Sequence, residues 1–234
     1  KSWRHIVLIL LLFTTASPGE ECVILLHGLA RTKKSMTSLE SALKAGGYQV
    51  LNVQYPSRTG TIEELSEPAI SNALAQCNAM SAEKVHFVTH SLGGIMVRDY
   101  LSRHTVTNLG RVVMLAPPNQ GSEVVDRLHN NFIFKWLNGP AGQQLGTSTN
   151  ALPLRLGSVT FPLGVIAGDR SINWINSTMI PGPDDGKVSV SRTKIEGMTD
   201  HRVVHTAHPF IMTNRKAIAL AVTVGSNKNV PSLL

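Results

Sequence analysis

The stretch Val85-His86-Phe87-Val88-Thr89-His90-Ser91-Leu92-Gly93-Gly94 is the part of the sequence that decides the fold. Its first five residues are strand-like, and Ser91 follows them between small or flexible neighbours. A buried strand that ends in a small-x-Ser-x-Gly turn and opens a helix bends so tightly that the serine hydroxyl is pushed out above the sheet. That turn normally begins with glycine, whereas this chain has the branched Thr89. The sequence therefore predicts a strand, a turn that exposes Ser91, and a helix from Gly94 to Ser102.

Strand-like runs recur along the chain and alternate with helical segments. The first, Cys22 to Leu26, is wholly apolar, as expected for a strand covered on both faces. The further predicted strands are Tyr48 to Tyr55, Val112 to Leu115, Leu163 to Ala167 and Arg202 to Thr206. This alternation favours a mostly parallel sheet with helices on both faces, whose functional groups collect at the carboxyl ends of the strands. A chain of 234 residues, 42% of them hydrophobic, can bury one such core, so we predict a single α/β domain.

Two of the helical segments carry end signals. Ser35 can cap a helix that Gly46-Gly47 terminates. Thr61 and Glu64 form a capping-box pattern at the start of another helix, and we expect Pro68 to break that helix into two pieces.

Residues 1–16 have the character of a signal peptide. Lys1 and Arg4 precede an apolar run from Ile6 to Phe13, and small residues follow it. The run is about half the length that a bilayer-spanning helix needs. We therefore predict cleavage after Ala16, a mature domain over residues 17–234, and a secreted or periplasmic protein.

The two cysteines, Cys22 and Cys77, remain in the predicted mature chain. In an oxidising compartment they can form a disulfide between the start of the first strand and the end of a later helix. Two buried free thiols are the alternative, because a sequence gives no distance between them.

The charge of the chain limits the classes of partner. The formal net charge is +7, and +5 remains after Lys1 and Arg4 of the predicted signal peptide are subtracted. No block of five basic residues occurs, so we expect a solvated basic surface and no nucleic-acid partner. A transient contact with an anionic membrane surface is compatible with this charge. No Cys/His cluster has the spacing of a zinc site, and we expect no metal.

Five motifs occur in a fixed order along the chain: His27-Gly28-Leu29, Thr89 to Gly94, Ala116 to Ser122, Asp184 to Val188, and His208 followed by Pro209-Phe210-Ile211-Met212. In this combination the chain resembles the α/β-hydrolase superfamily, and more narrowly its secreted bacterial triacylglycerol lipase and esterase group. The resemblance implies an α/β-hydrolase fold, a Ser-acid-His triad and an ester or lipid-like small-molecule substrate, with no cofactor.

The candidate nucleophile is Ser91, which needs a base within hydrogen-bond reach. In this fold the triad order is serine, acid, histidine, which excludes every histidine that precedes the acid. His201 and His205 alternate within the last predicted strand, where we expect partly buried structural side chains. His208 falls just past that strand and just before a helix that starts at Pro209, so we predict that it is the base.

The acid has two main candidates. Asp185 lies in a Gly-rich loop whose Asp-Gly-x-Val pattern resembles the lipase group, and we prefer it. Asp169 directly follows a predicted strand and stays open as the alternative, with a salt bridge to Arg170 or a loop cap as its structural interpretation. Asp184 is a third candidate; its alternatives are a turn residue or, by the resemblance, a metal ligand, although one acidic pair is little evidence for a metal.

Fixed hydrogen-bond donors must meet the oxyanion that forms when a serine attacks an ester. The backbone N–H of Leu92, directly after the serine, is one predicted donor. The resemblance implies that Leu29, the residue after His-Gly, supplies the other. We expect His27 to brace this loop.

Residues 123–156 lie between two predicted strands and are less regular than the rest. They carry Phe132, Phe134 and Trp136, and we predict a small cap over the carboxyl edge of the sheet. One side of the cap would be its own core and the other a wall for acyl chains.

We therefore predict a monomeric serine hydrolase of carboxylic esters with the triad Ser91, Asp185 and His208. An acyltransferase, a thioesterase or an amidase with the same triad is the alternative, because these enzymes share the acyl-enzyme step. A non-catalytic binding protein on the same fold is the other.

Overall fold

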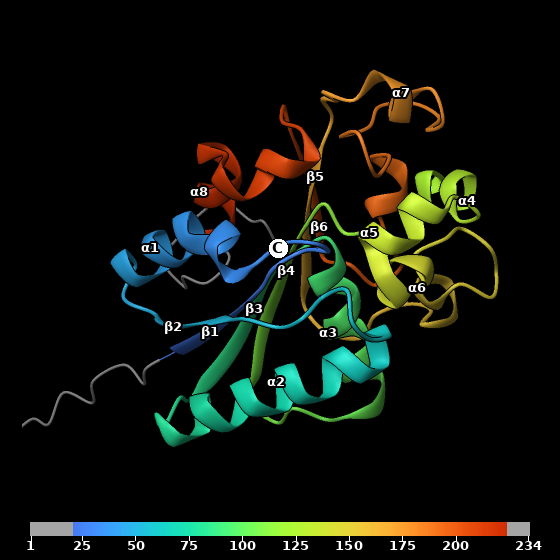
Figure 1. Cartoon of the computed structure of the whole chain (residues 1–234). Coiled ribbons are helices and arrows are strands. Elements are labelled where there is room, and N and C mark those ends of the chain that lie inside the picture. The colour runs from blue at the N-terminus through green and yellow to red at the C-terminus, as the bar shows by residue number, and fades with distance from the viewer. Residues whose placement is uncertain (1–20, 224–234) are drawn as a thin grey trace, which may run out of the picture.

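The computed structural model describes residues 21–223 of the chain, and the predicted signal peptide over residues 1–16 lies outside them. A six-stranded sheet in the order β2-β1-β3-β4-β5-β6 forms its centre, and every neighbouring pair of strands is parallel (Figure 1). The strands are β1 (Glu21–Leu26), β2 (Gln49–Val53), β3 (Lys84–His90), β4 (Leu109–Leu115), β5 (Leu163–Gly168) and β6 (Asp200–Val204). The predicted parallel α/β sheet is confirmed. Within residues 21–223 no helix is long and apolar enough to cross a membrane.

Helices cover both faces of the sheet. The helices α2 (Ile62–Ala79) and α3 (Leu92–Arg103) pack on one face, and α1 (Thr37–Ala45) and α8 (Arg215–Thr223) on the other (Figure 1). Successive side chains of β1 enter the two cores in turn: Ile24 and Leu26 face α2 and α3, and Val23 and Leu25 face α1 and α8. This two-sided burial explains why residues 22–26 of the strand are all apolar.

A disulfide joins Cys22 in β1 to Cys77 near the end of α2, with 5.8 Å between their Cα atoms. Both residues are fully buried in the core on that face. Of the two arrangements that the sequence left open, the structure therefore contains the disulfide, which ties α2 to the sheet.

The helix α2 runs through Pro68 without interruption, so the prediction that this proline breaks it was wrong. The capping box of Thr61 and Glu64 is present at its start as predicted. Pro68 lies on the exposed side of the helix, while Leu65 and Ile70 bury the other side. Packing of that apolar side outweighs the one backbone hydrogen bond that a proline removes.

Between β4 and β5 the chain forms α4 (Glu123–Leu128), α5 (Phe132–Gln143) and α6 (Leu152–Arg155), which lie together at one side of the sheet (Figure 1). This group is anchored at its base. The Ala141 N–H donates to the carbonyl of Gly60 at 3.1 Å, and the buried Arg98 of α3 donates to the carbonyls of Pro153 and Gly157, each at 2.8 Å. The short helix α7 (Trp174–Ser177) follows β5.

Three turns of 3-10 helix complete the described chain. They are η1 (Lys33–Met36), η2 (Ser191–Thr193) and η3 (His208–Thr213). The helix that the sequence placed at Pro209 is thus η3, which begins one residue earlier.

Candidate active site

Ser91 occupies the turn between β3 and α3 in a strained backbone conformation. Its φ is 51° and its ψ is −116°, a region that residues with a side chain rarely adopt. The turn brings the start of α3 against the end of β1. A Cβ on Gly93 would lie only 2.6 Å from the carbonyl oxygen of Leu26, so this close approach requires glycine. The result is the sharp strand-turn-helix that the sequence predicts.

Thr89, which stands where such turns normally have glycine, is accommodated by the glycine at position 94. The Thr89 side chain is fully buried, and its hydroxyl lies 3.4 Å from the carbonyl oxygen of Val113 in β4. A Cβ on Gly94 would lie 3.3 Å from the Thr89 hydroxyl and 3.1 Å from the sulfur of Met114. Gly94 therefore provides the space that the branched side chain needs.

The structure brings Ser91, His208 and Asp185 into one hydrogen-bonded chain. The Nε2 atom of His208 lies 3.1 Å from the Ser91 hydroxyl, and its Nδ1 atom lies 2.7 Å from a carboxylate oxygen of Asp185. The three residues are 8%, 5% and 1% exposed, respectively. In this geometry the imidazole can accept the serine proton while the carboxylate holds the ring.

The Asp185 loop is fixed by its own backbone. The second carboxylate oxygen of Asp185 accepts hydrogen bonds from the N–H groups of Lys187 and Val188, at 3.0 and 2.9 Å. The His208 N–H donates to the carbonyl of Asp185 at 2.9 Å, so the acid and the histidine are joined through the main chain as well. Asp184 accepts from the Gly186 N–H and the Ser177 hydroxyl and thus has the position of a turn residue.

Asp169 lies apart from this chain and pairs with His205. The two side chains are 2.9 Å apart, and that of His205 is 71% exposed. Because β6 ends at Val204, His205 is neither in the strand nor partly buried, and that prediction was wrong. His201 does lie in β6 and is half-buried, with its Nε2 2.8 Å from the hydroxyl of Thr193. The predicted salt bridge from Asp169 to Arg170 is replaced by the pair with His205.

Two backbone N–H groups near Ser91 can receive a negatively charged oxygen. Leu92 is the first residue of α3, so its N–H has no acceptor in the helix. The Leu29 N–H has no acceptor among residues 21–223. Its loop is braced by His27, whose ring stacks on Tyr55 with centroids 4.1 Å apart, and the Tyr55 hydroxyl donates to the His27 carbonyl. Burial lowers the pKa of His27, so its ring is held in the neutral form.

His90 is a further part of the site. The order of the triad residues in the sequence excludes it as the base and gives it no other role. Its Nε2 lies 3.2 Å from the carbonyl oxygen of His208. A Cβ on Gly28 would lie 2.6 Å from its Nδ1, so the ring fills the space between the Leu29 loop and His208. Burial lowers the pKa of His90 well below its usual value, and the neighbouring His208 adds to the effect. The neutral ring acts as a spacer, and its position directly before Ser91 is the sequence signal that could have indicated this.

A cavity of about 260 Å³ opens beside Ser91 and His208. Phe134 of α5 and Leu145 behind it form part of its apolar wall, together with Val124 and Val125 of α4. The segment around α7 contributes Ile172, Asn173 and Asn176 from the other side, which the sequence had not indicated. Residues 21–223 contain no group of three or more His, Cys, Asp or Glu side chains placed to hold a metal ion.

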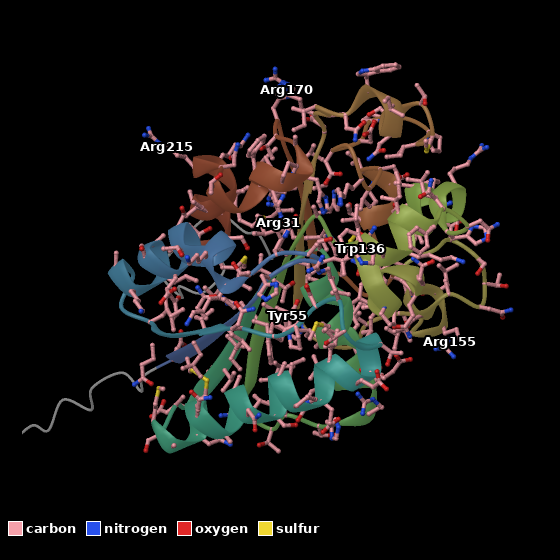
Figure 2. All side chains as sticks on the ribbon, in the orientation of Figure 1. Arg31, Tyr55, Trp136, Arg155, Arg170 and Arg215 are labelled. Atoms are coloured by element: carbon pink, nitrogen blue, oxygen red, sulfur yellow. A yellow bond between two sulfur atoms is a disulfide. The ribbon has the colours of Figure 1, made fainter. Side chains whose placement is uncertain are left out.

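Large apolar side chains are exposed on the two segments that flank this cavity. On α5 they are Phe132, Ile133, Trp136 and Leu137, and around α7 they are Ile172, Trp174 and Ile175. Figure 2 shows Trp136 on the α5 side of the molecule.

The sequence pattern of the family described as "Alpha/beta hydrolase family" matches residues 23–209. A sequence search of curated proteins found no match. Among solved structures, the mature Bacillus licheniformis lipase BlEst2 is similar with a TM-score of 0.70 at 17% identity, over 89% of this chain and 93% of that chain. A thermophilic esterase from Thermogutta terrifontis has a TM-score of 0.56 at 13% identity, over 88% and 89% of the two chains.

The phospholipase PlaB from Legionella pneumophila has a TM-score of 0.59 at 17% identity, and the match covers 74% of this chain and 45% of that chain. At these identities the likenesses show the shared fold.

Proposed function

The chain belongs to the alpha/beta hydrolase family, and from that premise we propose that it is a serine hydrolase of carboxylic esters that works through an acyl-enzyme on Ser91. The observation that carries the proposal is the buried chain of hydrogen bonds from Ser91 through His208 to Asp185. The similar folds of a lipase, a phospholipase and an esterase support an ester as the substrate.

In the first half of the reaction, the Ser91 oxygen attacks the carbonyl carbon of the ester while the Nε2 atom of His208 takes the serine proton. The Asp185 carboxylate accepts from the Nδ1–H of His208, which holds the ring with Nε2 toward the serine and stabilises the imidazolium. The tetrahedral intermediate then expels the alcohol, which leaves with the proton from His208. The acyl group stays on Ser91.

In the second half, a water molecule attacks the acyl-enzyme and gives its proton to the Nε2 atom of His208. Collapse of the second tetrahedral intermediate releases the carboxylic acid, and the proton returns from His208 to the Ser91 oxygen. The Leu29 and Leu92 N–H groups point at the oxyanion in both halves, and each is worth about 3 kcal/mol of transition-state stabilisation. Because the donors belong to the backbone, Leu29→Ala should have a mild effect.

The segment over residues 123–156 acts in this proposal as a small cap on the single domain. Phe134 and Leu145 form the wall that takes the acyl chain, and the anchors at Gly60 and Arg98 hold the base of the cap in place. The disulfide between Cys22 and Cys77 supports an oxidising compartment, so we propose that the protein is secreted or periplasmic. We also propose that it is a monomer.

The test compares variants on p-nitrophenyl esters of short and long acids. Ser91→Ala should abolish p-nitrophenol release and the labelling of the protein by a fluorophosphonate probe. Asp185→Asn should lower kcat by about ten-thousand-fold, as in other triads. Asp169→Asn is the matched control, because it removes a partly exposed carboxylate that does not contact His208, and it should change kcat less than about threefold.

Wild-type turnover by the Ser91→Ala protein would refute the proposal. Equal losses from the two aspartate substitutions would refute the assignment of the acid. Product analysis with added alcohol, thiol or amine acceptors separates hydrolysis from acyl transfer, since these outcomes share the acyl-enzyme.

A further inference from the structure

Two positively charged side chains face the candidate active site, although ester cleavage by the triad requires neither. Arg31 follows the Leu29 loop after β1, and Lys187 comes two residues after Asp185. Both line the cavity that contains Ser91 and His208. Figure 2 shows Arg31 near the centre of the molecule, whereas Arg215, the first residue of α8, lies at its periphery. The fold thus brings two like charges from distant segments to one cavity.

The one carboxylate in the cavity wall is outnumbered by these two cations. Neither Arg31 nor Lys187 forms a side-chain ion pair or hydrogen bond within the described part of the chain. The acidic residue of the wall is Asp185. Its two oxygens are already occupied by His208 and by the N–H groups of Lys187 and Val188. Two cations and one carboxylate therefore line the cavity, which leaves an excess of one positive charge.

The two charges act on one another and on the site. The Lys187 residue is exposed at the mouth of the cavity, yet partial burial of its ammonium group lowers its pKa; Arg31 lowers that pKa further, and Asp185 opposes the shift. Both side chains also disfavour protonation of His90, so their potential reaches the residue next to Ser91. Like charges that line one cavity repel each other, and an anion bound in that cavity relieves the repulsion.

We propose that the preferred esters of this enzyme carry a negative charge, a carboxylate or a phosphate, near the scissile bond, and that Arg31 and Lys187 bind it. The inference rests on the proposed esterase function of the same site. The planar guanidinium of arginine matches both kinds of anion with paired donors, and lysine adds a mobile point charge. The apolar wall at Phe134 and Leu145 takes the hydrocarbon part of the same substrate.

The experiment compares charged and uncharged esters of the same shape. On the acyl side, p-nitrophenyl glutarate ends in a carboxylate, and p-nitrophenyl isoheptanoate is its uncharged isostere. On the alcohol side, dibutyryl phosphatidate carries a phosphate and dibutyryl glycerol does not, with butyrate release followed by pH-stat titration. The measured quantity is the ratio of kcat/KM for the charged ester to that for the uncharged one. The wild-type ratio should exceed one in at least one pair, and that pair identifies which side of the ester carries the anion.

Arg31→Gln and Lys187→Gln should each lower that ratio about tenfold, the worth of a hydrogen bond to a charged group. Arg31→Lys and Lys187→Arg keep the positive charge, so these variants should retain most of the preference for the charged ester. Arg215→Gln is the matched control: it removes the same charge from a distant, exposed position at the start of α8 and should leave the ratio unchanged.

The inference is overturned if the wild type shows no preference for either charged ester, or if the preference survives both substitutions to glutamine. Either result, obtained with active protein, leaves the esterase proposal intact. Failure of the esterase proposal looks different, because all four esters would then be stable and the fluorophosphonate probe would not label Ser91.

Discussion

Removal of the disulfide between Cys22 and Cys77 should destabilise the protein by an amount that follows from the loop it closes. The two cysteines are 55 residues apart in sequence. A cross-link over a loop of that length lowers the entropy of the unfolded chain enough to stabilise the native state by about 4 kcal/mol at 25 °C. With a typical urea dependence of about 2 kcal/mol per molar, the unfolding midpoint should fall by about 2 M. The native fold needs no rearrangement, because β1 and α2 already pack together in the core.

The assay is urea unfolding of the oxidised protein, the protein in dithiothreitol, and the variant that combines Cys22→Ala with Cys77→Ala. Reduction isolates the cross-link, whereas the variant also removes two buried sulfur atoms and should be less stable than the reduced protein. Reductant should leave the variant unchanged. A difference of less than about 1 kcal/mol between oxidised and reduced protein would contradict the loop-closure argument.

Three further results are expected. Gly93→Ala should abolish most esterase activity, because its Cβ would meet a backbone carbonyl of β1 at 2.6 Å. Gly164→Ala in β5 is the control and should keep the activity, because a Cβ there meets nothing within 4 Å. Hydrolysis of p-nitrophenyl esters by the two variants tests this. Pro68→Ala on the exposed side of α2 should raise the free energy of unfolding by about 2 kcal/mol and Tm by about 5 °C, because it restores a helical hydrogen bond. A lower Tm by calorimetry would contradict this. Burial lowers the pKa values of His86 and His90 below the ordinary 6.5, so below about pH 6.5 the unfolded chain binds more protons than the folded one. The free energy of unfolding should therefore decrease as the pH is lowered below about 6.5, by up to about 1.4 kcal/mol per pH unit for each histidine. His86→Gln should reduce that slope in urea titrations at several pH values.

The parts of the fold that depend on local pattern could be predicted from the sequence. The apolar runs of β1 and β3 identify buried parallel strands, and the turn at Ser91 follows from its small neighbours. The capping box of α2 was equally readable. Pro68 was misjudged because its local cost is outweighed by packing of the opposite side of the helix.

The choice between Asp169 and Asp185 needed the tertiary structure. Both follow β5 in the chain. The Asp-Gly-x-Val pattern favours Asp185, but a sequence gives no distance from either carboxylate to His208. The strand predicted over residues 202–206 lies two residues beyond the observed β6. This displacement put His205 in the strand, whereas it is an exposed partner of Asp169. The sequence could not show that Arg31 and Lys187 line one cavity, because each is an ordinary exposed residue in its own segment.

The position of His208 is determined by more contacts than the two of its ring. Its N–H donates to the carbonyl of Asp185, and its own carbonyl lies 3.2 Å from Nε2 of His90. His90 in turn fits against Gly28 with no space for a Cβ. The neutral ring of His90 therefore connects the Leu29 loop to the backbone of His208, and the backbone of His208 is joined in turn to that of Asp185. A shift of any one of them would move the others, which explains how three loops from separate strands can hold a serine and an imidazole at 3.1 Å.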